Sequence, residues 1–303
     1  MLQHRSAADF TRAMQSLVRP LYDLNRNPVA WRFANSQLVY YGIFAALNAA
    51  FTGTMFAYYL YLKGQLHHVD LLLVLPGLAL SVWFFSRLFH LIALGRKFFR
   101  KPVKYLLETG FYVQGGIFGA GLGAVVVSTT SSVDLLVAVD GLAYGAVIGL
   151  VFGRLGCYTY GCCHGRPTSV PWGTVYHHPE SKVLRLKPEL AGKSIHPTQL
   201  YTSLANLVGF AIITVLIAFH PADGFLAAFF LLFHGSSRLL IERFRGDTHF
   251  HEGRNWFTRN VALVFLVAGL SLGVSSLSTG LQATTLARLH EPGTFVQLVT
   301  TDG

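Results

Sequence analysis

Long apolar runs alternate with short polar segments along this chain, and the alternation predicts its architecture. Seven runs are long enough to cross about 30 Å of hydrocarbon as helices. They cover residues 38–62, 70–94, 111–131, 134–156, 198–219, 223–243 and 257–278. The pattern therefore predicts an all-α, polytopic membrane protein with seven transmembrane helices.

The polar segments carry no repeat, no low-complexity tract and no sign of a second domain, so we expect a single integral membrane domain. Within residues 1–303 we distinguish an N-terminal interfacial segment (1–37), a polar loop (157–197) and a C-terminal tail (279–303). The first of these has apolar residues at helical spacing, namely Phe10, Met14, Leu17 and Leu21. This spacing favours a helix lying at the membrane interface, and a partly ordered tail is the alternative.

Composition supports the membrane assignment and narrows the partners. Hydrophobic residues make up 52% of the 303 residues and charged residues only 13%, against about 25% charge in soluble domains. The net charge of +10 comes from Lys and Arg beside apolar runs, which favours anionic lipid over nucleic acid as the partner. None of the seven runs contains a lysine, so a Schiff-base retinal receptor is disfavoured.

The positive charge is unevenly divided between the two ends of the predicted spans. Seventeen Lys and Arg residues lie in the segments on one face, and only Lys63 and Arg288 lie on the other. The positive-inside rule then predicts a cytoplasmic N-terminus and an external C-terminus.

Residues 153–201 concentrate arginine, histidine and tyrosine between two apolar runs. Arg154 interrupts the end of the fourth run, where a guanidinium is costly unless it meets an anion. The chain then leaves the apolar phase through residues 161–166 and returns to it at residues 196–201. We therefore place the functional site here.

Several motifs in this stretch stand in a distinctive order. They are Gly153-Arg154-Leu155-Gly156, Gly161, Gly165-Arg166, Pro171-Trp172 and His196-Pro197-Thr198-Gln199-Leu200-Tyr201. In order and spacing they resemble the signature of the prolipoprotein diacylglyceryl transferases. These bacterial membrane enzymes move diacylglyceryl from phosphatidylglycerol to the lipobox cysteine of a prolipoprotein and release glycerol phosphate.

The resemblance implies an enzyme of the bacterial inner membrane that uses membrane lipid and a prolipoprotein and needs no cofactor. The motif-bearing loops of that family are expected on the outer face, whereas here the matching loops carry the basic residues. Two alternatives therefore stay open. One is a divergent member that uses phosphatidylglycerol with a non-lipoprotein acceptor, and the other is a non-catalytic lipid-binding or transport protein.

The resemblance also assigns site residues. Arg154 and Arg238 offer forked donors for phosphate oxygens, and Glu242 lies four residues after Arg238. His196 or His234 is expected to be the base. The expected catalytic set is Arg154, Arg238, His196 and Glu242. The expected substrate-binding set is Tyr41, Arg87, Gln114, Gly115, Gly116, Gly156, Arg166, Gln199, Tyr201, His234 and Arg245.

Some of these residues also have a purely structural interpretation. Arg87 can snorkel toward a helix end, and the glycines at 115 and 116 begin a series whose spacing suits close helix packing. Gln114 stands where the family commonly has His, and Gln cannot act as a base at neutral pH.

The three cysteines are a further departure from the family pattern. Cys157 stands where the family has Asn, and Cys162 and Cys163 stand where it has Glu and an apolar residue. Their spacing is poor for a structural disulfide and matches no common metal motif, so we predict no metal site. Packing at a tight helix exit and a reactive thiol both remain open for these side chains.

Overall fold

The prediction of seven membrane-spanning helices is confirmed by the structure, a computed structural model that describes residues 24–33, 37–107, 112–246 and 256–289. Seven helices are long and apolar enough to cross a membrane. They are α2 (Tyr40–Leu62), α3 (Leu71–Leu94), α6 (Val113–Thr130), α7 (Leu135–Tyr160), α9 (Thr198–Ile217), α10 (Phe225–Glu242) and α11 (Trp256–Leu289).

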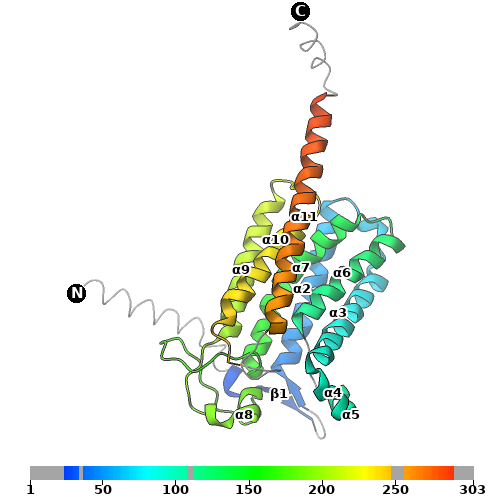
Figure 1. The fold of residues 1–303 in the computed structure, drawn as a ribbon. Coiled ribbons are helices and arrows are strands. Elements are labelled where there is room, and N and C mark those ends of the chain that lie inside the picture. The colour runs from blue at the N-terminus through cyan, green and yellow to red at the C-terminus, as the bar shows by residue number, and fades with distance from the viewer. Residues whose placement is uncertain (1–23, 34–36, 108–111, 247–255, 290–303) are drawn as a thin grey trace, which may run out of the picture.

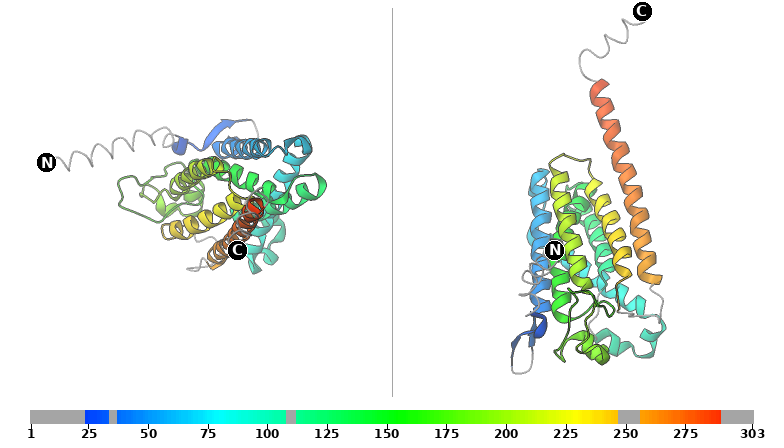
Figure 2. Two further views of the ribbon diagram at one scale, coloured as in Figure 1. Left: turned by 90° about the horizontal axis from the view of Figure 1, so that it is seen from above. Right: turned by 90° about the vertical axis from the view of Figure 1, so that its left-hand side faces the viewer.

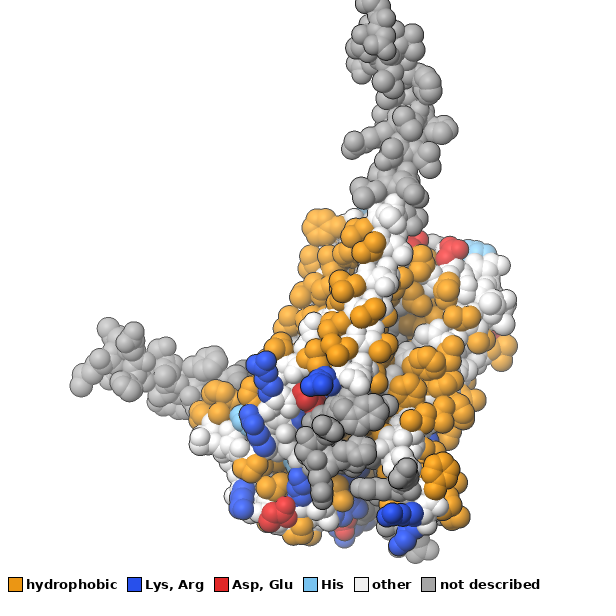
Figure 3. Space-filling view, viewed as in Figure 1, with side chains coloured by type: hydrophobic (Ala, Val, Ile, Leu, Met, Phe, Trp, Pro, Cys, Tyr) orange, Lys and Arg blue, Asp and Glu red, His pale blue; other side chains and the backbone are white. Residues whose placement is uncertain are grey.

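The long helices run side by side, with α7 at the centre of the bundle (Figures 1 and 2). The helix α7 is the most deeply buried of the seven, and it packs along α2 and α9. Apolar side chains cover the flank of the bundle, while Lys and Arg gather at the end where the loops lie (Figure 3). This distribution suits a bundle whose flank faces lipid and whose ends face water.

Glycines allow α7 and α2 to approach backbone to backbone. A Cβ on Gly145 would lie 2.3 Å from the carbonyl oxygen of Thr52, and a Cβ on Gly149 would lie 2.3 Å from Asn48 Oδ1. Such contacts are too short for any side chain, so only glycine permits this close approach of α2 and α7, which we call the glycine seam. Small residues at helix interfaces have this role throughout membrane proteins.

A buried carboxylate joins α7 to the start of α10. Asp140 is fully buried and accepts hydrogen bonds from the backbone amides of Gly224 and Ala227, each at 2.8 Å. Tyr59 Oη in α2 donates to it at 3.3 Å. The backbone amides at the start of a helix have no acceptors within that helix. Here Asp140, on another helix, provides the acceptors for the start of α10.

The loop end contains short elements that the apolar pattern did not predict. An antiparallel pair, β1 (Val29–Arg32) and β2 (Gln37–Val39), precedes α2. Short helices lie there between the long ones, namely α4 (Arg96–Arg100), α5 (Pro102–Leu107) and α8 (Lys182–Leu186), with the 3-10 turn η2 (Pro188–Leu190). A second 3-10 turn, η1 (Leu66–His68), follows α2 at the opposite end of the bundle.

Two predicted boundaries differ from the structure, and a further prediction falls on residues that the structure does not describe. The helix α7 continues through Cys157 to Tyr160, so the polar loop begins at Gly161, where φ is +78°. The helix α11 extends through residue 289, into the segment predicted as a C-terminal tail. The predicted interfacial helix around residues 10–21 lies outside the described residues.

Candidate functional site

The loop end of α7 presents a buried cation. Arg154 is only 6% exposed, and within the described part of the chain its guanidinium makes no hydrogen bond or ion pair. Two residues further along, a Cβ on Gly156 would lie 2.9 Å from Phe44 Cβ and 3.4 Å from the Tyr41 ring. Gly156 therefore brings α2 and Tyr41 close to this end of α7, and its role is close packing.

The loop end of α10 carries a charged triplet. Arg238 Nη2 lies 2.7 Å from Glu242 Oε2 on the next turn, and Arg245 Nε lies 4.0 Å from the same oxygen. All three side chains are largely buried, with 10%, 18% and 12% exposed. One carboxylate thus orients two guanidiniums and leaves one net positive charge.

His234 connects these two groups of charges. Its side chain is buried between Phe230 and Phe265, and its Nε2 makes no hydrogen bond to any described residue. The ring lies within electrostatic range of both Arg154 and Arg238. The fold therefore brings together three predicted residues from two helices, two cations and an imidazole nitrogen without a partner.

The polar loop is fixed to the helix ends by backbone contacts. Gly165 bridges Arg245, and a Cβ at position 165 would lie 2.3 Å from the carbonyl oxygen of His196. Gly165 is therefore required where the loop, the end of α10 and the start of α9 converge. The Gln199 side chain donates to the Cys162 carbonyl at 2.7 Å and is fully buried, which indicates a bracing role for it.

An aromatic group forms the rim of the site on the loop side. His196 Nδ1 lies 3.1 Å from Tyr201 Oη, which accepts a hydrogen bond from Trp172 Nε1 at 2.9 Å. The rings of His196 and Phe244 are 5.1 Å apart. Burial, and then the nearby Arg166 guanidinium, hold the pKa of His196 below its usual 6.5, so the imidazole is neutral at pH 7.

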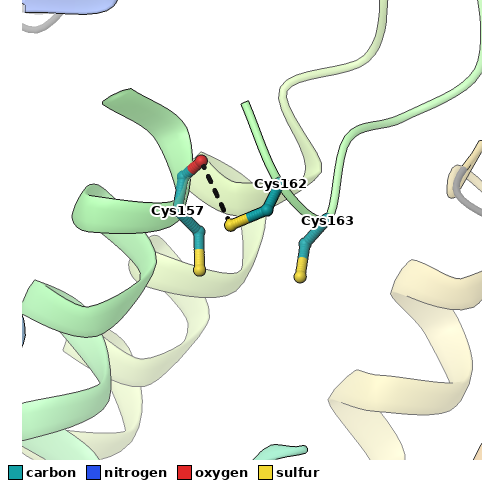
Figure 4. Close-up of side chains that lie close together, drawn as sticks. All are labelled: Cys157, Cys162 and Cys163. Carbon is teal, nitrogen blue, oxygen red and sulfur yellow. Dashed lines mark hydrogen bonds between the residues drawn. The ribbon is translucent and has the colours of Figure 1, made fainter. Parts of the chain in front are cut away.

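The three cysteines form one cluster (Figure 4). Cys157 lies on α7, one turn after Arg154, and Cys162 and Cys163 follow the end of that helix. Their Sγ atoms lie within 4.8 Å of one another, all three thiols are free and half-buried, and Cys162 Sγ lies 3.8 Å from the Cys157 carbonyl oxygen.

Cys163 has a left-handed backbone conformation, with φ at +56°. Hydrogen bonds from Cys157 and Cys162, and then the Arg245 and Arg154 charges, lower the pKa of the Cys163 thiol below its usual value. The sequence spacing had predicted no metal site. The fold nevertheless brings together three sulfur atoms that could bind a metal, although their sequence spacing matches no common metal motif.

Other predicted residues have different surroundings. Arg87 Nη2 donates to the carbonyl oxygens of Tyr105 and Leu106 at 2.6 and 2.8 Å, and so it caps the end of α5. A Cβ on Gly115 would lie 2.3 Å from the Phe85 carbonyl oxygen, and a Cβ on Gly116 2.8 Å from Ser86 Oγ. These two glycines pack α6 against α3, as their spacing allowed.

Gln114 differs from Arg87, Gly115 and Gly116 because no contact gives it a structural role. It is buried at the start of α6, and its amide makes no hydrogen bond within the described residues.

Sequence reasoning missed two contributors to the rim and one to the scaffold. Trp172 was recognised as part of the Pro171-Trp172 motif but was given no place in the site, because interfacial residues of this kind are common beside membranes. Phe244 was not singled out at all. Asp140 was also missed, although a carboxylate within an apolar run is itself a signal of a specific partner.

Comparison with known proteins relates this arrangement to one family. The sequence profile of the family described as prolipoprotein diacylglyceryl transferase matches residues 28–275. A phosphatidylglycerol–prolipoprotein diacylglyceryl transferase of Clostridium novyi is 26% identical over 260 residues, which cover 82% of this chain and 96% of that protein.

Two further relatives carry the same name. The Geobacter sulfurreducens protein is 29% identical over 232 residues, covering 72% of this chain and 82% of that protein. The Bordetella avium protein is 27% identical over 259 residues, covering 82% and 88%.

Proposed function

This chain belongs to the prolipoprotein diacylglyceryl transferase family, and from that premise we propose that it transfers diacylglyceryl from phosphatidylglycerol to the lipobox cysteine thiol of a prolipoprotein. The chain spans most of the length of relatives named for this activity. It is a multi-pass membrane protein, and we propose the bacterial inner membrane as its location because that is where this lipid and acceptor meet.

The reaction determines what the site must supply. The acceptor sulfur attacks the terminal glyceryl carbon, an S–C bond forms, and the C–O bond to phosphate breaks. The electron pair of that bond goes to the phosphate oxygen, so glycerol phosphate leaves with one more negative charge than the diester had. Preorganised cations at such a developing charge are the largest contribution to many enzymatic rate enhancements.

The observation that carries the proposal is the buried guanidinium of Arg154, which has no partner among the described residues. A buried charge of this kind is costly until an anion reaches it, and the phosphate of a lipid headgroup supplies one. Arg238 adds a second donor group held by Glu242. The free Nε2 of His234 can donate to a further phosphate oxygen.

His196 has the properties of the proton acceptor. Its imidazole is neutral at pH 7, it lies at the rim where an acceptor peptide would enter, and the Tyr201 hydroxyl orients it. The remaining substrate-binding residues we propose are Tyr41, Gln114, Arg166 and Tyr201.

The charge distribution favours one alternative for the acceptor. The loop end that carries the site is also the basic end of the molecule (Figure 3). If this end faces the cytoplasm, as the positive-inside rule predicts, the chain is a divergent member with a non-lipoprotein acceptor.

A direct assay tests the proposal. Purified protein is incubated with labelled phosphatidylglycerol and a lipobox peptide, and the products are measured by mass spectrometry. We expect a diacylglyceryl peptide and an equal amount of glycerol phosphate, and no product on a matched peptide with Ser in place of the lipobox cysteine. Glycerol phosphate without a lipidated peptide would favour another acceptor. If neither product formed, that result would contradict a transferase function.

A further inference from the structure

We propose that Cys157, Cys162 and Cys163 bind a zinc ion and leave its fourth coordination position open for the acceptor thiol. This inference rests on the proposed function for its account of catalysis, but the metal site itself is argued from the cluster alone. The three sulfurs come from a helix end and the turn that follows it, and no other cysteine occurs in the chain.

The positions of the sulfur atoms suit one ion. Three thiolates bound at about 2.3 Å around one zinc lie about 4 Å apart, and the Sγ atoms here lie within 4.8 Å of one another. Small rotations of the side chains therefore suffice. Cys163 has a positive φ of 56°, which is backbone strain that a bound ion would offset.

The number of ligands indicates an open position. Structural zinc sites in proteins are closed by four ligands, whereas catalytic sites have three and an exchangeable fourth. Among the described residues the group contains three sulfurs and no fourth ligand. His164, the adjacent imidazole, instead directs its Nδ1 to the Gly165 carbonyl oxygen at 2.9 Å. The three cysteine residues are partly exposed, not fully enclosed.

The surrounding charges suit a thiolate-rich ion. Zinc with three thiolates carries one net negative charge, and binding of the acceptor thiolate adds a second. The Arg154 and Arg245 guanidiniums act electrostatically on this cluster, which favours a group of thiolates there. A soft cation is selected by sulfur ligands over the hard cations Mg²⁺ and Ca²⁺.

The site would generate the nucleophile beside the phosphate-binding cation. A thiol that coordinates zinc is deprotonated, so the acceptor S–H loses its proton to water and then to the His196 imidazole as the Zn–S bond forms. The bound sulfur attacks the glyceryl carbon while the C–O bond to phosphate breaks. Arg154 lies one helical turn before Cys157 and so can receive the leaving phosphate. The product is an uncharged thioether, a poor ligand that leaves the zinc.

Metal analysis and cobalt substitution test the site directly. We expect one zinc ion per chain in protein purified without chelator. Replacement by Co²⁺ should give sulfur-to-cobalt charge-transfer absorption and intense visible bands of a tetrahedral ion. A lipobox peptide should change these visible bands, whereas the matched Ser peptide should not. Protein with no bound zinc and no cobalt–sulfur absorption would overturn the proposal.

Variants separate this inference from the proposed function. Cys163→Ser should lose the zinc and slow transfer by roughly 10²–10⁴-fold, the usual effect of losing the group that generates a nucleophile. Thr159→Ala is the matched control. Thr159 is buried on the same turn of α7 as Cys157, and among the described residues its hydroxyl bonds only the Gly156 carbonyl, so zinc and activity should remain.

A chelation experiment does not depend on a variant folding. Removing zinc from the wild-type protein should abolish transfer, and adding it back should restore transfer. Transfer at the wild-type rate by metal-free protein would overturn the zinc site and leave the proposed function intact. A cobalt spectrum that responds to the peptide thiol without any transfer would contradict the proposed function and support the site.

Discussion

Asp140 in α7 accepts a hydrogen bond from the backbone amide of Gly224 at 2.8 Å, across 84 residues of sequence. The same carboxylate binds the Ala227 amide and the Tyr59 hydroxyl, so a single side chain holds the start of α10 against α7 and α2. The opposite end of α10 carries Arg238 and Glu242, so the contact fixes the helix that presents half of the site.

Removal of this carboxylate should destabilise the protein strongly. Asp140→Ala leaves two buried amides without acceptors, at about 1–3 kcal/mol each, so we expect the free energy of unfolding in detergent to fall by about 3 kcal/mol or more. Asp140→Asn keeps one carbonyl acceptor and should lose less. An alanine variant as stable as the wild type would contradict the role of Asp140.

The glycine seam between α2 and α7 gives a matched pair of substitutions. Gly145→Ala would place a Cβ 2.3 Å from the Thr52 carbonyl oxygen, and forcing the helices apart should cost about 1–3 kcal/mol. Gly121→Ala is the control, because a Cβ there meets nothing within 4 Å. It should leave the protein as stable or make it more stable by up to about 1 kcal/mol. Thermal unfolding measures both, and equal melting temperatures would contradict the tight seam.

Arg154 should be essential for transfer and not for folding. Arg154→Ala removes a donor to the developing phosphate charge, and we expect kcat/KM to fall roughly 10²–10³-fold. Arg154→Lys should recover only part of the loss, since an ammonium cannot form the forked pair. The control is Arg243→Ala, at an exposed arginine near the end of α10, which should transfer at the wild-type rate. Wild-type activity in Arg154→Ala would remove this residue from the site.

The pH dependence of transfer should report His196. Its pKa lies below 6.5 because of burial and the Arg166 charge, so the neutral base is present at pH 7 and is lost only as the pH falls through that lowered value. Arg166→Gln removes the cation, raises the pKa and should shift the acid limb of kcat/KM to higher pH. An unchanged acid limb would show that another group titrates.

Membrane orientation can be measured with reporters at the C-terminus. The charge bias predicts an external C-terminus, so an alkaline phosphatase fusion should be active and a green fluorescent protein fusion dark. The reverse result would place the loop end with the site outside, and the basic residues of that end would then serve anionic lipid.

The helices could be predicted from the sequence because hydrocarbon leaves the backbone few choices. A run such as residues 198–219 must satisfy its amides internally, so its apolar length nearly determines α9 (Thr198–Ile217). In water the backbone amides can bond to solvent, so hydropathy does not determine the structure of polar segments. For this reason the strands β1 and β2 and the short helix α8 were not predicted.

The site could be predicted in part for a similar reason. Arg154 and Arg238 were identifiable because a charge within an apolar run needs a partner. The contact between Arg87 and the end of α5 depends on how that short helix packs against α3. The periodicity of apolar residues in the sequence does not predict such packing. The clustering of Cys157 with Cys163 likewise depends on a left-handed turn that only the structure shows.

The backbone bridge between Gly165 and Arg245 has a consequence for how the site responds to substrate. The amide of Gly246 also donates to the His164 carbonyl at 3.0 Å, and Lys187 Nζ binds the Gly246 carbonyl at 2.7 Å. Because folding already orders the rim against α10, little chain freedom is left to be lost when lipid binds. The expected signature is a binding heat capacity without a contribution from folding of the polar loop at residues 161–197.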